Sequence, residues 1–389
     1  MWFFASVFKM RSRLNGIIVL VAFITVFWCG VCSGVGTGEI DAVRRKGVLS
    51  GGDLAIIDRF VAEGVEELVD TRDFASVGKL RQTILACAHS STKSAEGQYS
   101  DQFLDSARKY IPAGFEAASS LEPEDRRFKA ALNLLILVDE LKDSRVAELA
   151  FGMLNDENNV IRYWAVHAVT NAAVAEQLNS RVDTRAAGEI VRRLKAVVER
   201  ADARTTGLIA DFAARINIPE GQELLLQIVD LRMSKYADWT VENELLDSTI
   251  LKLLYEKMIS QESMDPGVAR RFGQLYSYAI QRYVKGRECI GQAGRYELAS
   301  VLVEIEYECI NSLLGGMRQR EIKKAVELED SMALLMEHNR LLGDDRKSGE
   351  LPVKLDFDYG RDSAGNKLAG PLKLADPPEG LCSAKADSP

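Results

Sequence analysis

The chain has 389 residues, of which 47% are hydrophobic and 27% are charged. That composition can bury a sizeable core and excludes a chain that is disordered throughout. The formal net charge is −8 at pH 7. Nucleic acid is therefore not an expected partner, because binding to phosphates needs a basic face.

The N-terminus has the three parts of a secretory signal. Basic residues come first, an apolar run over residues 17–29 follows, and small residues come after it. The pattern predicts a signal peptide over residues 1–33, with cleavage after Ser33. The apolar run is shorter than the roughly 20 residues that span a bilayer, but a retained signal anchor stays an alternative. The true start could also be Met10, because the stretch from there makes a tidier signal.

Both interpretations of the N-terminus predict export, because the positive flank stays inside the cell. The expected location is therefore periplasmic, cell-envelope or extracellular, with membrane contact only if the N-terminal segment is retained. Cleavage would leave the four cysteines Cys87, Cys289, Cys309 and Cys382. A turn near residues 291–294 would place Cys289 and Cys309 roughly 18 Å apart along a helix hairpin. A disulfide needs Cα atoms within about 7 Å, so buried free thiols are expected at both positions.

Apolar residues recur at helical spacing after the predicted signal peptide. A start signal at Ser50–Asp53 precedes a predicted helix over residues 54–68, and a second is predicted over residues 74–84. Residues 89–99 are polar and predict a loop.

A further helix is predicted to start at Ser100 and to be interrupted at Pro112. Pro123, followed by two acidic residues, opens the next helix.

The later part of the chain continues the helical pattern. Asp265–Pro266 is a strong helix start, and apolar residues then recur over residues 268–283. A second apolar stripe over residues 298–309 ends at Gly315–Gly316. A further helix is predicted from about Arg320 to Leu342.

The last part of the chain changes character, since five of the nine prolines fall between Leu351 and Pro389. This composition predicts an extended or disordered tail over residues 344–389. It contains the single predicted strand, whose apolar residues alternate strictly: Val353, Leu355, Phe357 and Tyr359.

One helix pair has the features of an internal repeat. Asp143 starts a helix that is apolar up to Leu154, a tight turn covers residues 155–159, and alanines line the second helix. The segment from Leu154 to Val169 resembles the consensus of the HEAT-repeat family, which has an Asp in the turn and a Val-Arg pair opening the second helix. Those places and the apolar positions after them are taken here by Asp156, Ile161, Arg162, Ala165, Ala168 and Val169. The family's turn proline is replaced by Asn159.

The resemblance is best over residues 143–178 and looser to about residue 231. The spacing from Asp143 to Pro219 equals two units of 38 residues, close to the family's period of roughly 40. The resemblance implies an all-α, HEAT-like α-solenoid of antiparallel helix pairs, with an irregular helical bundle as the alternative. The expected organisation is an N-terminal helical region, HEAT-like repeats, a C-terminal helical region and the tail, at residues 39–124, 125–238, 239–343 and 344–389.

The second helix of the clear repeat carries a candidate binding strip. At 100° per residue, the strip lies opposite the alanine face, and solenoids often bind partners along such inner helices. It consists of Tyr163, Val166, His167 and Thr170. Ordinary packing or plain exposure is the alternative role of these residues.

The sequence contains no pattern of catalytic, cofactor-binding or metal-binding residues that we could identify. Glu304 and Glu308 share a helical face, but the Glu-x-x-His pairs of di-metal bundles are missing, so a solvated acidic face is expected. The leading hypothesis is an exported, non-enzymatic scaffold or module that binds protein partners. The alternatives are an enzyme or enzyme accessory, such as the HEAT-like lyases, and a membrane-tethered structural protein.

Overall fold

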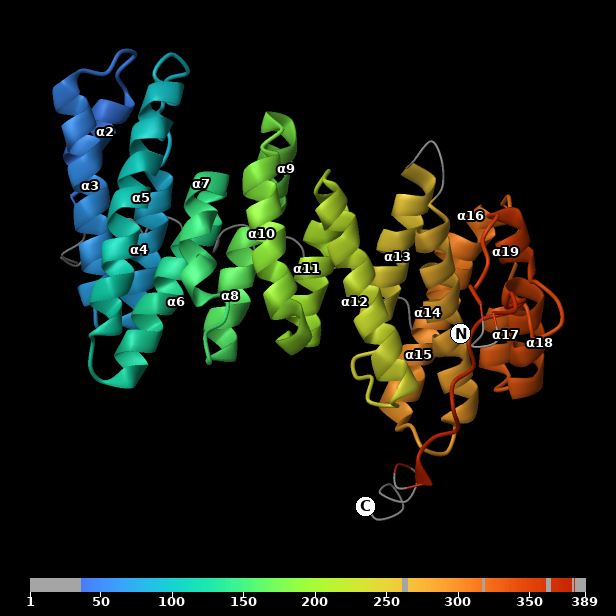
Figure 1. Ribbon diagram of the computed structural model, residues 1–389. Coiled ribbons are helices and arrows are strands. Elements are labelled where there is room, and N and C mark those ends of the chain that lie inside the picture. The colour runs from blue at the N-terminus through green and yellow to red at the C-terminus, as the bar shows by residue number, and fades with distance from the viewer. Residues whose placement is uncertain (1–35, 261–264, 317–318, 362–364, 380, 382–389) are drawn as a thin grey trace, which may run out of the picture. The chain divides into compact units, whose positions relative to one another are not determined.

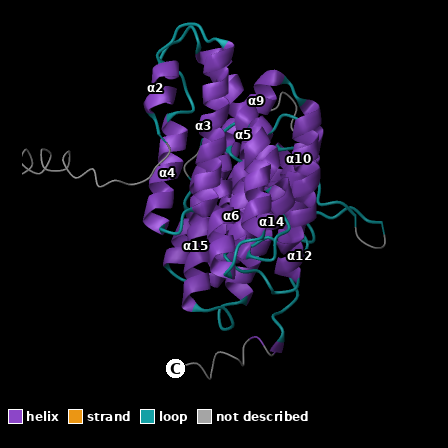
Figure 2. Ribbon diagram, turned by 90° about the vertical axis from the view of Figure 1, so that its left-hand side faces the viewer, coloured by secondary structure: helices purple, strands orange, loops and turns teal. Residues whose placement is uncertain are grey.

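The computed structural model describes residues 36–260, 265–316, 319–361, 365–379 and 381. The predicted signal over residues 1–33 lies outside this part of the chain. The described residues form helices and loops and contain no β-strand, so the predicted all-α class is confirmed (Figures 1 and 2). None of the described helices is both long and apolar enough to cross a membrane.

The described residues divide into two compact units, one that ends at Leu134 and one that begins at Leu135. Helix α6 (Glu124–Leu141) runs across the boundary between them. The other helices of the first unit are α2 (Gly38–Arg44), α3 (Gly51–Asp70), α4 (Phe74–Ala86) and α5 (Glu96–Ser119).

Helices α3 and α5 form the centre of the first unit. The predicted start of α3 is confirmed, because Ser50 and Asp53 form a reciprocal capping box. The predicted loop over residues 89–99 is too long, and the predicted interruption at Pro112 is wrong, because α5 starts at Glu96 and continues through the proline. A continuous buried face of α5 packs against α3 and outweighs the hydrogen bond that proline cannot donate.

The second unit begins with short helical elements and continues with longer helices. In chain order its first elements are α7 (Ser144–Ala147), the 3₁₀ segment η1 (Glu148–Met153), α8 (Asn159–Val169), α9 (Ala172–Arg181), α10 (Thr184–Val197), the 3₁₀ turn η2 (Val198–Arg200), α11 (Ala203–Arg215) and α12 (Pro219–Ala237). They are followed by α13 (Leu245–Ser260), α14 (Pro266–Lys285), α15 (Gln292–Ile305), the π-helical turn η3 (Glu306–Ile310), α16 (Asn311–Leu313), α17 (Glu321–Glu327), α18 (Ser331–Leu342) and α19 (Glu350–Lys354).

Helix α14 is the most enclosed helix of the second unit's C-terminal part. It contacts α12, α13, α15 and α18, and its residues from Phe272 to Tyr283 are all buried. The predicted start is confirmed, since Asp265 accepts a hydrogen bond from the Gly267 amide ahead of the first turn and Pro266 is its first residue. Burial on nearly every side brings polar side chains of α14 into the interior.

The predicted single helix over residues 320–342 is wrong, because it is divided into α17 and α18. Glu329 has a positive φ of 51°, and Asp330 then caps α18 by accepting hydrogen bonds from the amides of Met332 and Ala333. A local side-chain cap thus competes successfully with the helical hydrogen bonds that would continue the helix.

The predicted strand over residues 353–359 is also wrong, because α19 includes Val353 and an irregular segment follows. Leu355, Phe357 and Tyr359 are buried, while Val353 is 71% exposed. A Cβ added at Gly273 of α14 would lie 3.0 Å from the Tyr359 hydroxyl. The alternation therefore reflects packing against a helix.

The expectation of free thiols is confirmed for Cys309 and wrong for Cys289. Cys87 and Cys309 are buried free thiols, whereas Cys289 is disulfide-bonded. The predicted separation of about 18 Å bears only on a bond between Cys289 and Cys309.

Candidate functional site

The most distinctive polar arrangement lies on α14 and involves two glutamines. Gln274 and Gln281 are seven residues apart, which is close to two helical turns and places both on one face. Their exposed fractions are 5% and 6%. A buried amide that lacks hydrogen bonds is costly, so the partners of these two side chains are structurally important.

Both glutamines bind the main chain of a segment that lies about 90 residues later. Gln274 accepts a hydrogen bond from the Leu372 amide at 2.8 Å and donates one to the Leu372 carbonyl at 3.1 Å. Gln281 accepts one from the Leu374 amide at 2.8 Å and donates one to the Leu372 carbonyl at 3.0 Å. Each side-chain amide therefore acts as a donor and as an acceptor toward the same extended backbone.

Two more side chains continue this arrangement toward the end of α14. Lys285 donates to the Leu374 carbonyl at 2.7 Å and forms an ion pair of 2.8 Å with Asp376. The indole nitrogen of Trp239, in the loop between α12 and α13, donates to the Ala375 carbonyl at 3.2 Å. We call Trp239, Gln274, Gln281 and Lys285 the α14 face, and residues 371–376 the docked segment, which appears red in Figure 1.

The docked segment is held mainly by its backbone. Leu374 is its one deeply buried leucine, at 2% exposure, while Leu372 is 51% exposed. Burying one leucine stabilises by about 1.5 to 3 kcal/mol, and each neutral hydrogen bond adds about 1 kcal/mol. Sequence-independent contacts therefore account for a large share of the interaction.

A second layer of hydrogen bonds fixes Gln281. Its amide donates to Ser277 Oγ at 2.8 Å, and Ser277 Oγ lies 2.8 Å from His338 Nε2. His338 Nδ1 lies 2.9 Å from Asn339 Oδ1. Burial lowers the pKa of His338, which favours the neutral ring. A neutral ring with its proton on Nδ1 satisfies all of these hydrogen bonds. The Nδ1 proton is donated to Asn339, and Ser277 donates to Nε2.

Close backbone packing holds the chain immediately before the docked segment. A Cβ added at Gly370 would lie 2.8 Å from the Asp344 amide nitrogen and carbonyl oxygen. At Gly343, whose φ is +99°, a Cβ would lie 2.7 Å from the Ala369 carbonyl. Only glycine fits these positions without a backbone shift, so the docked segment starts from a fixed point.

The predicted strip on α8 is only partly available to a partner. The side chains of Val166 and Thr170 are buried, at 0% and 6% exposure, and Thr170 Oγ1 donates back to the Val166 carbonyl. These two residues therefore belong to the packed interior. Tyr163 and His167 are half-buried, with ring centroids 5.9 Å apart.

His167 has a specific intramolecular role. Its Nδ1 lies 2.9 Å from a carboxylate oxygen of Asp139, which also accepts a hydrogen bond of 2.8 Å from Asn171. The hydrogen bond to Asp139 is the main reason that the pKa of His167 is raised. This arrangement ties α6 to α8 and to the start of α9.

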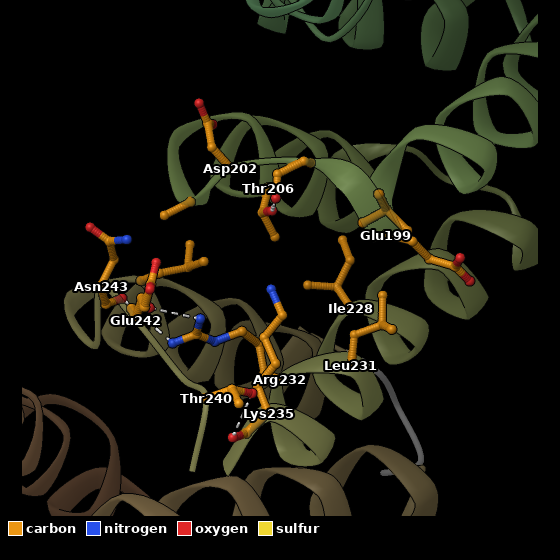
Figure 3. A pocket seen from close by; sticks show the side chains of 14 residues that line it. Glu199, Asp202, Thr206, Ile228, Leu231, Arg232, Lys235, Thr240, Glu242 and Asn243 are labelled. Atoms are coloured by element: carbon orange, nitrogen blue, oxygen red, sulfur yellow. Dashed lines mark hydrogen bonds between the residues drawn. The ribbon is translucent and has the colours of Figure 1, made fainter. Parts of the chain in front are cut away.

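A polar pocket of about 170 Å³ lies between η2, α11, α12 and the loop before α13 (Figure 3). Arg232 lines it, but its guanidinium is already bound to both carboxylate oxygens of Asp247, at 2.8 Å each, and to the Glu242 carbonyl at 3.0 Å. Tyr236 donates a further hydrogen bond of 2.7 Å to Asp247. The Arg232 guanidinium at the pocket is therefore satisfied within the protein.

The α14 face was not among the sites predicted from the sequence. One signal was present, because two glutamines interrupt a helix that is otherwise apolar on several sides, at a spacing that puts them on one face. Glu304 and Glu308, in turn, both pair with Lys252 of α13, at 2.5 and 2.9 Å. Comparisons with protein-family models, with curated proteins and with solved structures found no match for this chain.

Proposed function

We propose that this protein is an exported, non-enzymatic scaffold of HEAT-like helix pairs that binds other proteins through extended segments laid on the α14 face. The observation that carries the proposal is the pair of glutamines, each of which binds both an amide and a carbonyl of the same extended backbone. Such contacts recognise the amide and carbonyl groups of a polypeptide backbone and do not depend on its side chains.

The pattern of contacts between helices supports a repeat architecture. Helix α10 contacts α9 and α12, α11 contacts α12 and α13, and α12 contacts α14. Contacts between near neighbours in sequence are what stacked helix pairs require. The turn of the clearest repeat supports it as well, since Arg162 donates to the Asp156 carbonyl at 2.6 Å and Asn158 caps α8.

The disulfide at Cys289 supports export. Disulfides persist in oxidising compartments and are rare in the cytosol. This agrees with the signal-like pattern of the N-terminal sequence. Periplasmic, cell-envelope and extracellular locations all fit this chemistry.

A peptide array tests the proposed function. The full chain would be compared with the Leu374→Asp variant, in which a buried carboxylate releases the docked segment. We expect the variant to bind arrayed extended peptides more strongly than the unchanged protein does. We also expect the added substitution Gln281→Glu to abolish the gain, because a carboxylate cannot donate to a peptide carbonyl.

Two results would contradict the proposed function. One is that no peptide binds to the Leu374→Asp variant although circular dichroism shows it folded. The other is that binding is unaffected by Gln281→Glu.

A further inference from the structure

The docked segment is bound in the manner of a peptide ligand. Six hydrogen bonds join its backbone at Leu372, Leu374 and Ala375 to side chains of the α14 face. Main-chain atoms of the segment meet side chains of helix α14 and of the loop before α13, as would be expected for an extended peptide bound from another chain.

We propose that the docked segment is a resident competitor on the α14 face, and that the partner displacing it is an extended peptide with an aliphatic residue followed two positions later by an acidic one. This inference rests on the proposed function, since it names the partner of the same face.

The aliphatic position follows from Leu374, which has 2% exposure and is the point at which side-chain size matters. The acidic position follows from Asp376, whose carboxylate pairs with Lys285 at 2.8 Å. Leu372 and Lys373 are exposed, so their side chains are free to vary. The amides of residues 372 and 374 are both bound, so proline is excluded from the corresponding positions of a partner.

Displacement is compatible with the rest of the fold. Both glutamine amides make these hydrogen bonds with the segment itself, so water that enters after displacement could take the place of its backbone. The ion pair between Lys285 and Asp376 is largely solvated, with Asp376 89% exposed, and holds the segment weakly. A segment on the same chain nevertheless competes at a high effective concentration, which lowers the apparent affinity for a peptide in solution.

A fluorescent peptide covering residues 370–379 provides the test, with binding followed by fluorescence polarisation. The full-chain Leu374→Asp variant should bind it at least about tenfold more tightly than the unchanged protein, because its own segment no longer competes. The matched control Leu372→Asp changes an exposed leucine and should behave like the unchanged protein. Thermal melts would confirm that both variants are folded.

Peptide variants then test the motif. A peptide in which the residue matching Leu374 is aspartate should lose binding, and one with lysine in place of Asp376 should bind several-fold more weakly. If the unchanged protein and both leucine variants bind the peptide equally, the segment is no competitor and the inference is wrong.

The same comparison separates the two proposals. Arrayed peptides that bind the Leu374→Asp variant without enrichment of the aliphatic and acidic positions would overturn this inference and leave the proposed function standing. Failure of every arrayed peptide would overturn both.

Discussion

The Leu374 amide donates a hydrogen bond of 2.8 Å to the side-chain oxygen of Gln281, which lies 93 residues earlier in the chain. The same glutamine donates to the Leu372 carbonyl. A buried glutamine that satisfies both of its functions on a non-helical backbone links the α14 helix to an extended segment without regard to side-chain identity. This relationship is the basis of the proposed binding function.

Two leucines of the docked segment should differ sharply in their contributions to its binding. Leu374→Ala removes a buried side chain and should destabilise the docked segment by about 2 to 3 kcal/mol. Leu372→Ala, two residues away and half exposed, should cost less than about 0.5 kcal/mol. Limited proteolysis between residues 371 and 376 measures both. Equal cleavage rates for the two variants would show that Leu374 does not anchor the segment.

The buried pair Arg232–Asp247 should be important for the stability of the second unit. Arg232→Met leaves the Asp247 carboxylate buried with only the Tyr236 hydroxyl, which should lower the free energy of unfolding by about 3 to 5 kcal/mol. Arg192→Met, which removes an exposed pair with Glu189, serves as the control and should leave the denaturant midpoint unchanged. Similar midpoints for the two variants would contradict this account.

The pKa values of two histidines should lie on opposite sides of the ordinary value of 6.5. The hydrogen bond to Asp139 raises the pKa of His167, so its stabilising effect is complete below pH 6.5 and is lost as the pH rises through the higher value of the folded state. Burial lowers the pKa of His338, so acidification below pH 6.5 favours the unfolded state, which binds that proton more readily.

Proton NMR titration of the two imidazole rings checks both directions. Substitution of each histidine by glutamine assigns the signals. His167→Gln should lower the melting temperature more at pH 5.5 than at pH 8, because the protonated ring gains more from the Asp139 carboxylate than the neutral ring does. Equal losses at the two pH values would show that the Asp139 contact does not depend on charge.

The cysteines should differ in reactivity. Cys87 and Cys309 are buried thiols whose pKa values are raised by burial, that of Cys309 to about 12, so both should resist alkylation until the protein is unfolded. Cys289 should resist alkylation even after unfolding unless a reductant is added. Mass spectrometry of non-reduced peptides identifies its partner. Alkylation of Cys289 in unfolded, non-reduced protein would contradict the disulfide.

Local patterns in the sequence predicted helix starts well where a capping side chain determines them. The capping residues Ser50 and Asp265 mark helix starts that the structure confirms. The predictions failed where packing against distant parts of the chain determines the local conformation. Pro112 remains helical because α5 packs along α3, and Phe357 and Tyr359 are buried because they lie beside Gly273 of α14.

The candidate site was even harder to predict, because its contacts join residues that are far apart in the sequence. A seven-residue spacing of glutamines is visible in the sequence, but no local pattern indicates that residues 371–376 supply their partners. On α8, helical periodicity placed Val166 and Thr170 opposite the alanine face, but neighbouring helices cover both sides, so both residues are buried. Tyr163 and His167 remain candidates for partner contact, and their joint replacement by alanine tests that prediction.

Hydrogen exchange of residues 371–376 tests the central claim most directly. We compare the unchanged protein with Gln281→Glu, which keeps the size of the side chain but loses the donor to the Leu372 carbonyl. Gln292→Glu, the same change at an exposed position on α15, is the control. We expect exchange of the Leu372 and Leu374 amides to become about tenfold faster or more in Gln281→Glu and to be unchanged in Gln292→Glu. Equally fast exchange of these amides in all three proteins would show that the α14 face does not hold an extended backbone.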